Sequence, residues 1–234
     1  MNFRSLVTTD AWRDLIDRGR RRTYPTNAVL LAQGESPDYV IALLEGLVKV
    51  AQSNECGDTL TLMLRGPGEV LGEMGALLNR PRSATVTAAR RCSGVVLPAH
   101  AFRGYVERHR LEPVIYRLTV ERLNSHERLR ADLVNLSSTA RVARVVSHLA
   151  DEVGQLQSAV GLLVELGMPR TELATMAAMR RSSALAALSE LQAAGILTLG
   201  RRRLVVTDVA RLRAVARGEE LPGCTGHKDS TPAL

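Results

Sequence analysis

The stretch from Arg22 to Pro98 most constrains the fold, because it alternates brief apolar segments with turn residues. Short strands at such close spacing are typical of an antiparallel barrel or roll, since a parallel sheet would need helical crossovers between its strands. The expected strands cover residues 28–31, 39–44, 47–52, 59–64, 84–88 and 94–97. The basic run Arg18–Arg22, just before this stretch, is expected to be an exposed rim.

One segment of this stretch, Gly66–Val86, combines residue types that suit a phosphate-bearing small molecule. Gly72 lets the backbone approach a ligand without a Cβ in the way, and Glu73 can accept hydrogen bonds from a sugar hydroxyl. Arg82 offers a planar fork of donors to phosphate oxygens, and Ser83 adds a hydroxyl beside it. Spacing alone leaves a surface ion pair between Glu73 and Arg82 as the alternative.

A long helical segment follows, with Pro113 in its first turn and no later Gly or Pro before Leu136. Apolar residues recur along it at steps of three and four, and polar residues interrupt this stripe in the middle. The apolar positions are Ile115, Leu118, Leu129, Leu133 and Leu136, and the polar ones are Arg122, Ser125 and His126. A second copy of the same helix is the expected partner of the stripe. The polar positions either set the register of that helix pair or contact the ligand.

Residues 137–217 predict a second domain that binds DNA. A short helix, a tight break at residues 178–179 and a second helix with a basic, hydroxyl-rich start form a helix-turn-helix pattern. A β-hairpin with a cationic tip follows and would be a wing. The expected DNA-contacting residues are Arg180, Arg181, Ser182, Ser183, Arg201, Arg202 and Arg203. The stretch 170–217 holds nine arginines against three acidic residues and carries most of the formal charge of +7.

The order of Gly72-Glu73, a small helical turn and the run RSATV over residues 82–86 resembles the phosphate-binding cassette of the cyclic-AMP receptor and fumarate-nitrate regulator (Crp/Fnr) family. The segment EGLVKV at residues 45–50 is similar to a strand of the same family. The resemblance implies an α+β fold with an N-terminal cyclic-nucleotide-binding-type β-roll, a long dimerisation helix and a C-terminal winged helix-turn-helix. It also implies a homodimeric transcription regulator of double-stranded DNA, with a cyclic nucleotide such as cyclic AMP as effector and RNA polymerase as a further candidate partner.

On the family pattern, Glu73 accepts from the ribose, Arg82 meets the cyclic phosphate with the help of Ser83, and the middle of the long helix, at Arg122 and His126, reaches the base. Here the sequence departs from the pattern, because the Thr-Ser pair that meets adenine is replaced by His126 and the Glu after it. The phosphate and ribose ends of the site match the family, whereas the base end does not, so the identity of the nucleotide stays open.

The recognition helix also departs from the family. Arg181 falls on the position that reads a guanine edge, but Ser182 and Ala186 replace the usual Glu and second Arg. The target sequence should therefore differ from the best-known palindrome of the family. Phosphate contacts from the basic residues could still supply affinity.

Several classes of protein are disfavoured. Three widely separated cysteines provide neither a disulfide framework nor a metal site, and no catalytic set of residues is visible, so we expect neither a metal centre nor an enzyme. No apolar run suggests a signal peptide or a membrane span, which favours a cytoplasmic location. The expected domains are the β-roll (1–110), the dimerisation helix (111–136), the winged helix-turn-helix (137–217) and a disordered tail (218–234).

Two other functions stay open. The protein could be a ligand-independent regulator in which Glu73 and Arg82 pair with each other or with Arg122. It could also be a cyclic-nucleotide-dependent module that binds a protein instead of DNA.

Overall fold

The N-terminal half is a roll of two antiparallel four-stranded sheets. The computed structural model describes residues 2–157 and 161–220, apart from the side chains of residues 126, 128, 130, 132, 133 and 157. One sheet has the order β1-β8-β3-β6, formed by Arg20–Tyr24, Cys92–Pro98, Tyr39–Glu45 and Val70–Leu71. The other has the order β2-β7-β4-β5, formed by Val29–Leu31, Thr85–Ala88, Val48–Ser53 and Thr59–Arg65. The six expected strands are confirmed, with ends that differ by at most two residues.

Three strands were missed, and one of them is the two-residue β6, which pairs with β3 through Ile41–Leu71 and Ala42–Val70. The arginines of the predicted rim at Arg18–Arg22 are exposed as expected, but the prediction left out β1, which begins at Arg20 and pairs with β8 from Arg20–Val96 to Tyr24–Cys92. Its first four residues are exposed, so main-chain hydrogen bonds and the buried Tyr24 hold an edge strand that has no apolar alternation. The predicted loop at residues 154–158 contains β9 (Gln155–Gln157), which pairs with β10 (Gly161–Glu165).

Helices cover one end of the roll. A short 3₁₀ helix η1 (Phe3–Leu6), α1 (Thr9–Asp17) and α3 (Ala99–Arg108) share a buried cluster that includes Phe3, Leu15, Phe102 and Tyr105. The side chain of Thr8 caps α1 by accepting from the amide of Ala11. Helix α2 (Glu73–Leu78) is the short turn of helix expected inside the phosphate cassette.

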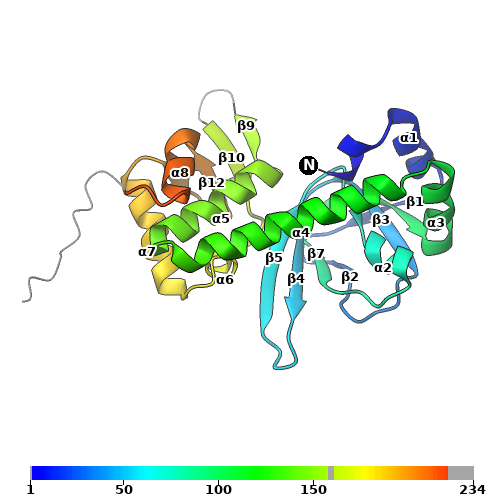
Figure 1. The fold of residues 1–234 in the computed structure, drawn as a ribbon, viewed down its shortest axis with the longest axis horizontal. Helices are drawn as coiled ribbons and strands as arrows, with labels where there is room; N and C mark the ends of the chain where they lie inside the picture. Colours follow the sequence, from blue (N-terminus) through cyan, green and yellow to red (C-terminus); the bar gives the residue numbers. More distant parts are fainter. Residues whose placement is uncertain (1, 158–160, 221–234) are drawn as a thin grey trace, which may run out of the picture.

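Helix α4 (Glu112–Asn135) runs from the roll to the C-terminal domain (Figure 1). Ile115 and Leu118 pack into the core of the roll, and Leu129 packs into the core of the C-terminal domain. The expectation that a second copy of the helix covers Ile115, Leu118 and Leu129 is therefore wrong, because other residues of the same chain bury them. Large apolar side chains on another face of α4, Tyr116 and Leu123, are exposed.

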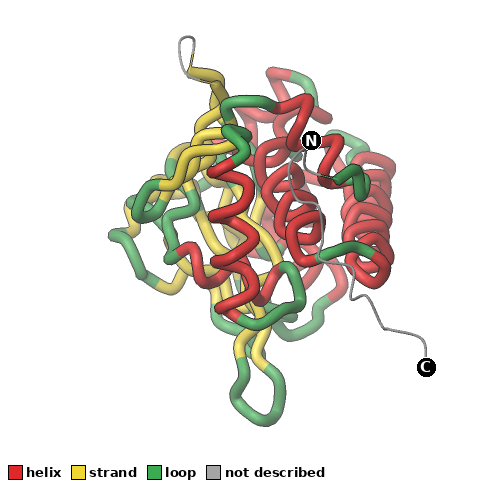
Figure 2. Tube along the Cα trace, turned by 90° about the vertical axis from the view of Figure 1, so that its left-hand side faces the viewer, coloured by secondary structure: helices red, strands yellow, loops and turns green. Residues whose placement is uncertain are grey.

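The C-terminal domain has the expected winged helix-turn-helix order. Its helices are α5 (Ser138–Val153), η2 (Arg170–Glu172), α6 (Leu173–Met176), α7 (Arg181–Ala193) and α8 (Val209–Ala216). Its sheet has the order β11-β12-β10-β9, in which Leu197–Leu199 and Arg203–Val206 form the wing hairpin. In the view of Figure 2, most helices of the whole molecule lie to one side of its strands. No helix in the described ranges is long and apolar enough to cross a lipid bilayer.

The two domains share a core. Leu47, Leu64 and Ala89 of the roll belong to the same buried cluster as α5, α6 and α7. Most of the expected tail, residues 221–234 with Cys224, lies outside the described residues.

Candidate effector cavity and DNA-binding surface

Gly72 links β6 to α2 in a conformation that other residues adopt with strain. Its φ is 80°, in the left-handed region. A Cβ at this position would lie 2.4 Å from Nη1 of Arg82. Glycine is thus needed twice, for the backbone turn and for the close approach of the guanidinium group.

Arg82 is held from both its main chain and its side chain. Its amide donates to the carbonyl of Glu35 at 3.0 Å, and its carbonyl accepts from the amide of Gly34 at 2.8 Å. The guanidinium group donates to the carbonyl of Gly72 at 2.8 Å and to the carbonyl of Tyr39. The residue is only 5% exposed, and burial lowers the pKa of its guanidinium group. Within the described part of the chain no carboxylate forms an ion pair with it, so Arg82 is a buried cation whose direct partners are neutral carbonyls.

Five of the six predicted effector residues surround one cavity of about 190 Å³, namely Gly72, Glu73, Arg82, Ser83 and Arg122. Most of the remaining wall is apolar and comes from both sheets, through Leu31, Val50, Met63, Leu71 and Val86. The side chain of His126, the sixth predicted residue, lies outside the described part of the structure. Pockets for drug-sized ligands usually measure roughly 300–1,000 Å³, so a nucleotide would need side chains to move before it could fit.

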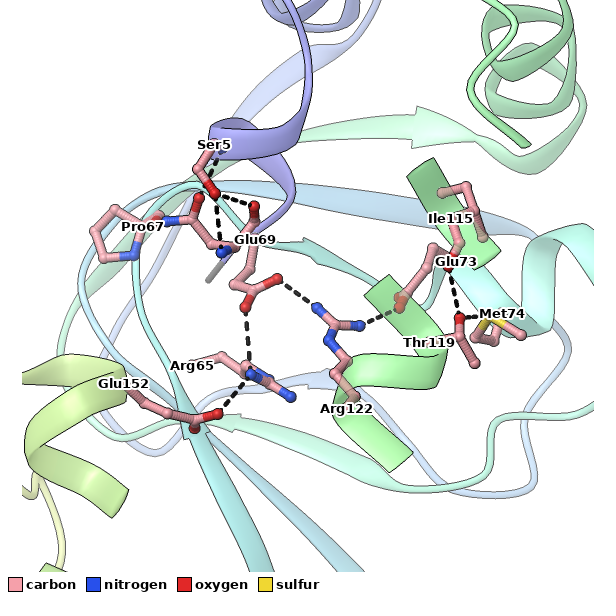
Figure 3. Close-up of polar contacts among 11 residues, drawn as sticks. Ser5, Arg65, Pro67, Glu69, Glu73, Met74, Ile115, Thr119, Arg122 and Glu152 are labelled. Carbon is pink, nitrogen blue, oxygen red and sulfur yellow. Dashed lines mark hydrogen bonds and ion pairs between the residues drawn. The ribbon is translucent and has the colours of Figure 1, made fainter. Parts of the chain in front are cut away.

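Glu73 is bonded to Arg122 in this arrangement. Arg122 donates from Nη1 to Glu73 at 2.5 Å and from Nη2 to Glu69 at 2.5 Å (Figure 3). Its Nε is buried without a partner among the described residues. One pairing expected for a ligand-independent protein, that of Glu73 with Arg122, is therefore present.

Sequence reasoning missed Glu69 and its second partner, Arg65. Arg122 lies on the same face of α4 as Ile115 and Leu118, where an apolar residue would be expected. A cation on the inward face of a helix needs buried carboxylates as partners. The position of Arg122 in the apolar stripe could therefore have indicated that acidic residues of the roll are buried beside it. Glu69 is 3% exposed and Glu73 is 7% exposed.

The charges in this cluster are unequal. Burial raises the pKa of the Glu69 carboxyl group, and Arg122 and Arg65 only partly oppose that effect. For Arg122, burial lowers the pKa, but attraction to Glu73 and Glu69 more than offsets it, so the pKa is raised. Arg122 is thus held firmly in its charged form, whereas Glu69 carries its charge at a cost.

The predicted DNA-contacting residues lie at the surface. Ala178, with φ of 50°, turns the chain between α6 and α7, and the start of α7 follows at once. Arg180, Arg181 and Ser182 are exposed and Ser183 is partly buried, and all three arginines of the wing tip, Arg201–Arg203, are exposed. None of these arginines forms an ion pair within the described residues, which leaves their charges available to phosphate groups.

Comparison with known families supports both halves of this description. Residues 21–109 match the family model for a cyclic nucleotide-binding domain, and residues 140–215 match the one for a Crp-like helix-turn-helix domain. The chain belongs to the Crp/Fnr family. As a Crp/Fnr protein, it is a DNA-binding transcription regulator with a cyclic nucleotide-binding domain.

Similar proteins match the Crp/Fnr chain over most of its length. A CRP-like cAMP-activated global transcriptional regulator of Mycobacterium tuberculosis is 25% identical over 83% of this chain and 87% of its own. A cyclic AMP receptor protein of Thermus thermophilus is 27% identical over 85% of this chain and 89% of its own. The solved structure of FixK2 from Bradyrhizobium japonicum is 18% identical, covers 84% of this chain and 96% of its own, and has a TM-score of 0.71.

The two domains of this Crp/Fnr protein meet through contacts of one polarity. On the roll, Lys49 reaches Glu172 of η2 at 2.8 Å, and Arg65 reaches Glu152 of α5 at 3.1 Å. Arg90 pairs with Glu165 of β10. In each contact the cation belongs to the roll and the carboxylate to the DNA-binding domain. Arg181 also lines a groove opposite the β4–β5 hairpin, so the start of the recognition helix faces the roll.

Proposed function

We propose that this protein is a homodimeric transcription regulator whose DNA affinity is set by a phosphate-bearing effector in the β-roll cavity. A cyclic nucleotide is the first candidate, and cyclic AMP leads because two relatives carry it in their names. The proposed effector-binding residues are Gly72, Glu73, Arg82, Ser83, Arg122 and His126. The proposed DNA-binding residues are Arg180, Arg181, Ser182, Ser183 and Arg201–Arg203.

One observation carries the effector proposal. Arg82 is a buried cation that bonds two carbonyl groups and no carboxylate of the described residues. A buried charge without a counter-ion is costly, so a site that retains one favours an incoming anion. Ser83 is exposed beside it and borders the same cavity, where its hydroxyl could donate to the anion.

The exposed face of α4 supports a dimer. Tyr116, Leu123 and Val134 are 73%, 56% and 71% exposed. They are separated by seven and eleven residues, which are close to whole numbers of helical turns, so they form one apolar stripe. A second copy of α4 would cover this stripe, which is distinct from the face that packs on the roll.

DNA binding by the dimer would place two copies of α7 in successive major grooves of a two-fold site. The arginines at the start of α7 and at the wing tip, which form no ion pair with another described residue, supply the positive charge for phosphate contacts. For an activator of this kind RNA polymerase would be a further partner. Driving the ratio of two arrangements from 1:99 to 99:1 takes about 5.5 kcal/mol of differential binding energy, which two equivalent effector sites could share.

The test combines calorimetry with DNA selection. Purified protein is titrated with cyclic AMP and cyclic GMP, and duplexes are selected from a random library with and without each nucleotide. We expect binding heat from at least one nucleotide, loss of that heat in Arg82→Gln, and a selected site with two-fold symmetry. Arg91→Gln, a change of an exposed arginine that does not border the cavity, is the control.

A ligand-independent regulator is the second candidate. Glu73 pairs with Arg122, and Arg82 donates hydrogen bonds to two carbonyl groups, so both side chains have partners within the protein without a ligand. Absence of heat together with a selected two-fold site would favour it. If no duplex is enriched under any condition, DNA regulation is refuted and a module that binds a protein becomes the better account.

A further inference from the structure

Five side chains form an ionic chain between the effector cavity and the DNA-binding domain (Figure 3). In order they are Glu73, Arg122, Glu69, Arg65 and Glu152, joined by contacts of 2.5, 2.5, 3.4 and 3.1 Å. Acidic and basic groups alternate along the chain. Each of the first four members comes from a different segment, namely α2, α4, the turn before β6 and β5, and the last lies near the end of α5.

The middle of the ionic chain is shielded from water. The side chains of Glu69 and Arg65 are 4% and 7% exposed. Away from water, neither group can exchange its partner for solvent at little cost, and screening by salt is weak. We therefore expect a shift of one side chain in the ionic chain to shift the side chain that it pairs with.

The two guanidinium groups are shared among three carboxylates, which leaves one negative charge in excess. Arg122 serves Glu73 and Glu69, and Arg65 serves Glu69 and Glu152. An anionic effector adds a further competitor for Arg122, whose buried Nε also lacks a partner among the described residues. The cavity is small, and Glu73 and Arg122 both line it, so an effector that fills it would lie against this pair.

We infer that Glu69 and Arg65 are positioning residues that transmit occupancy of the effector cavity to α5. An effector that draws Arg122 away from Glu69 leaves that carboxylate to Arg65 alone. Arg65 then moves toward Glu69 and releases Glu152, which loosens the docking of the DNA-binding domain on the roll. This inference rests on the proposed function, since it gives the route by which the effector would act.

The structure offers a matched control in the contact between Lys49 and Glu172. It also joins a roll cation to a carboxylate of the DNA-binding domain, at 2.8 Å, and Thr61 supports it with a hydrogen bond of 3.0 Å. No side-chain hydrogen bond or ion pair among the described residues joins Lys49 or Glu172 to a member of the ionic chain. Breaking it should loosen the domain interface without interrupting the ionic chain.

The experiment is a set of double-mutant cycles on the full chain without nucleotide. Affinity for a selected duplex is measured for Glu73→Gln, Glu152→Gln and the pair, then for Glu73→Gln with the control Glu172→Gln. We expect the ends of the ionic chain to depart from multiplicative behaviour by about fivefold or more, and the control pair to multiply within about twofold. The departure should vanish when the cycle is repeated in a Glu69→Gln background.

Multiplicative behaviour of Glu73 with Glu152, or a departure that survives Glu69→Gln, would overturn the inference. If no duplex is selected, the proposed function fails. The same double-mutant cycles, with the urea midpoint as the readout, still decide whether Glu73 and Glu152 are coupled through the ionic chain. A further readout uses cyclic AMP where it binds. Hydrogen exchange at residues 149–153 should rise on binding in the original protein and stay unchanged in Glu69→Gln, whereas a purely structural role for Glu69 would leave that rise intact.

Discussion

Replacing Arg122 with Gln tests the charge balance of the cluster most directly. The change leaves Glu73 without its partner and leaves Glu69 with only Arg65, at 3.4 Å. Removing one member of a buried ion pair typically costs about 3–5 kcal/mol. The Arg122 side chain is 22% exposed, so the lower end, about 3 kcal/mol at neutral pH, is expected. Glu69→Gln should cost only about 1–2 kcal/mol, because Arg122–Glu73 and Arg65–Glu152 persist and the excess charge disappears.

The cost in Arg122→Gln should depend on pH. Burial already raises the pKa of the Glu69 carboxyl group in the folded protein, and without Arg122 one of the two cations that oppose this effect is lost, so that pKa rises further above the unfolded value of about 4.3. A carboxyl group with a raised pKa contributes its stability at low pH and loses it as the pH rises through the folded pKa. The variant should therefore recover stability, relative to the original protein, between about pH 7 and pH 5.

Urea unfolding at these two pH values measures the effect, at one protein concentration because association also contributes to stability. Arg117→Gln on the exposed side of α4 is the control, since its pair with Glu121 is largely in water. A cost below about 1 kcal/mol at pH 7, or an equal cost at both pH values, would refute the reasoning.

Three further outcomes are expected. Gly72→Ala puts a methyl group 2.4 Å from a guanidinium nitrogen at a φ of 80°, so it should lower the urea midpoint and abolish nucleotide binding, whereas Gly104→Ala, with open space around it, should not destabilise. Changing Arg201–Arg203 to serine should reduce the slope of log affinity for DNA against log salt by about 2–3, and an unchanged slope would remove the wing from the interface. Cys56 is exposed, whereas burial raises the pKa of Cys92, so peptide mapping after brief alkylation should find label on Cys56 alone of these two. Early label on Cys92 would contradict its burial.

Local sequence predicted what depends on local chemistry. Strands with apolar alternation and turns with glycine were found, and Gly72, Glu73 and Arg82 do meet at one cavity. Strand β1 was missed because Arg20–Arg22 offers no apolar pattern, and its place in the sheet depends on hydrogen bonds from β8. That information lies some 70 residues away in the chain.

The partner of Glu73 was open for a similar reason. Which cation reaches this carboxylate depends on how α4 lies across the roll, and Arg122 is 49 residues away in sequence. The stripe on α4 was assigned to a second copy because a helix pattern shows which face is buried but not what covers it. Ile115 and Leu118 in fact meet the core of the roll.

Ion pairs between cations of the roll and carboxylates of the DNA-binding domain make the docking of the two domains sensitive to ionic strength. Added salt screens exposed pairs first, and the Lys49–Glu172 and Arg90–Glu165 side chains are 26–50% exposed, whereas Arg65 is 7% exposed. At high salt concentration the DNA-binding domain would be held to the roll mainly by the Arg65–Glu152 pair and the shared apolar core. The same solution that weakens phosphate contacts would thus sharpen the response to the effector, because fewer competing restraints would remain.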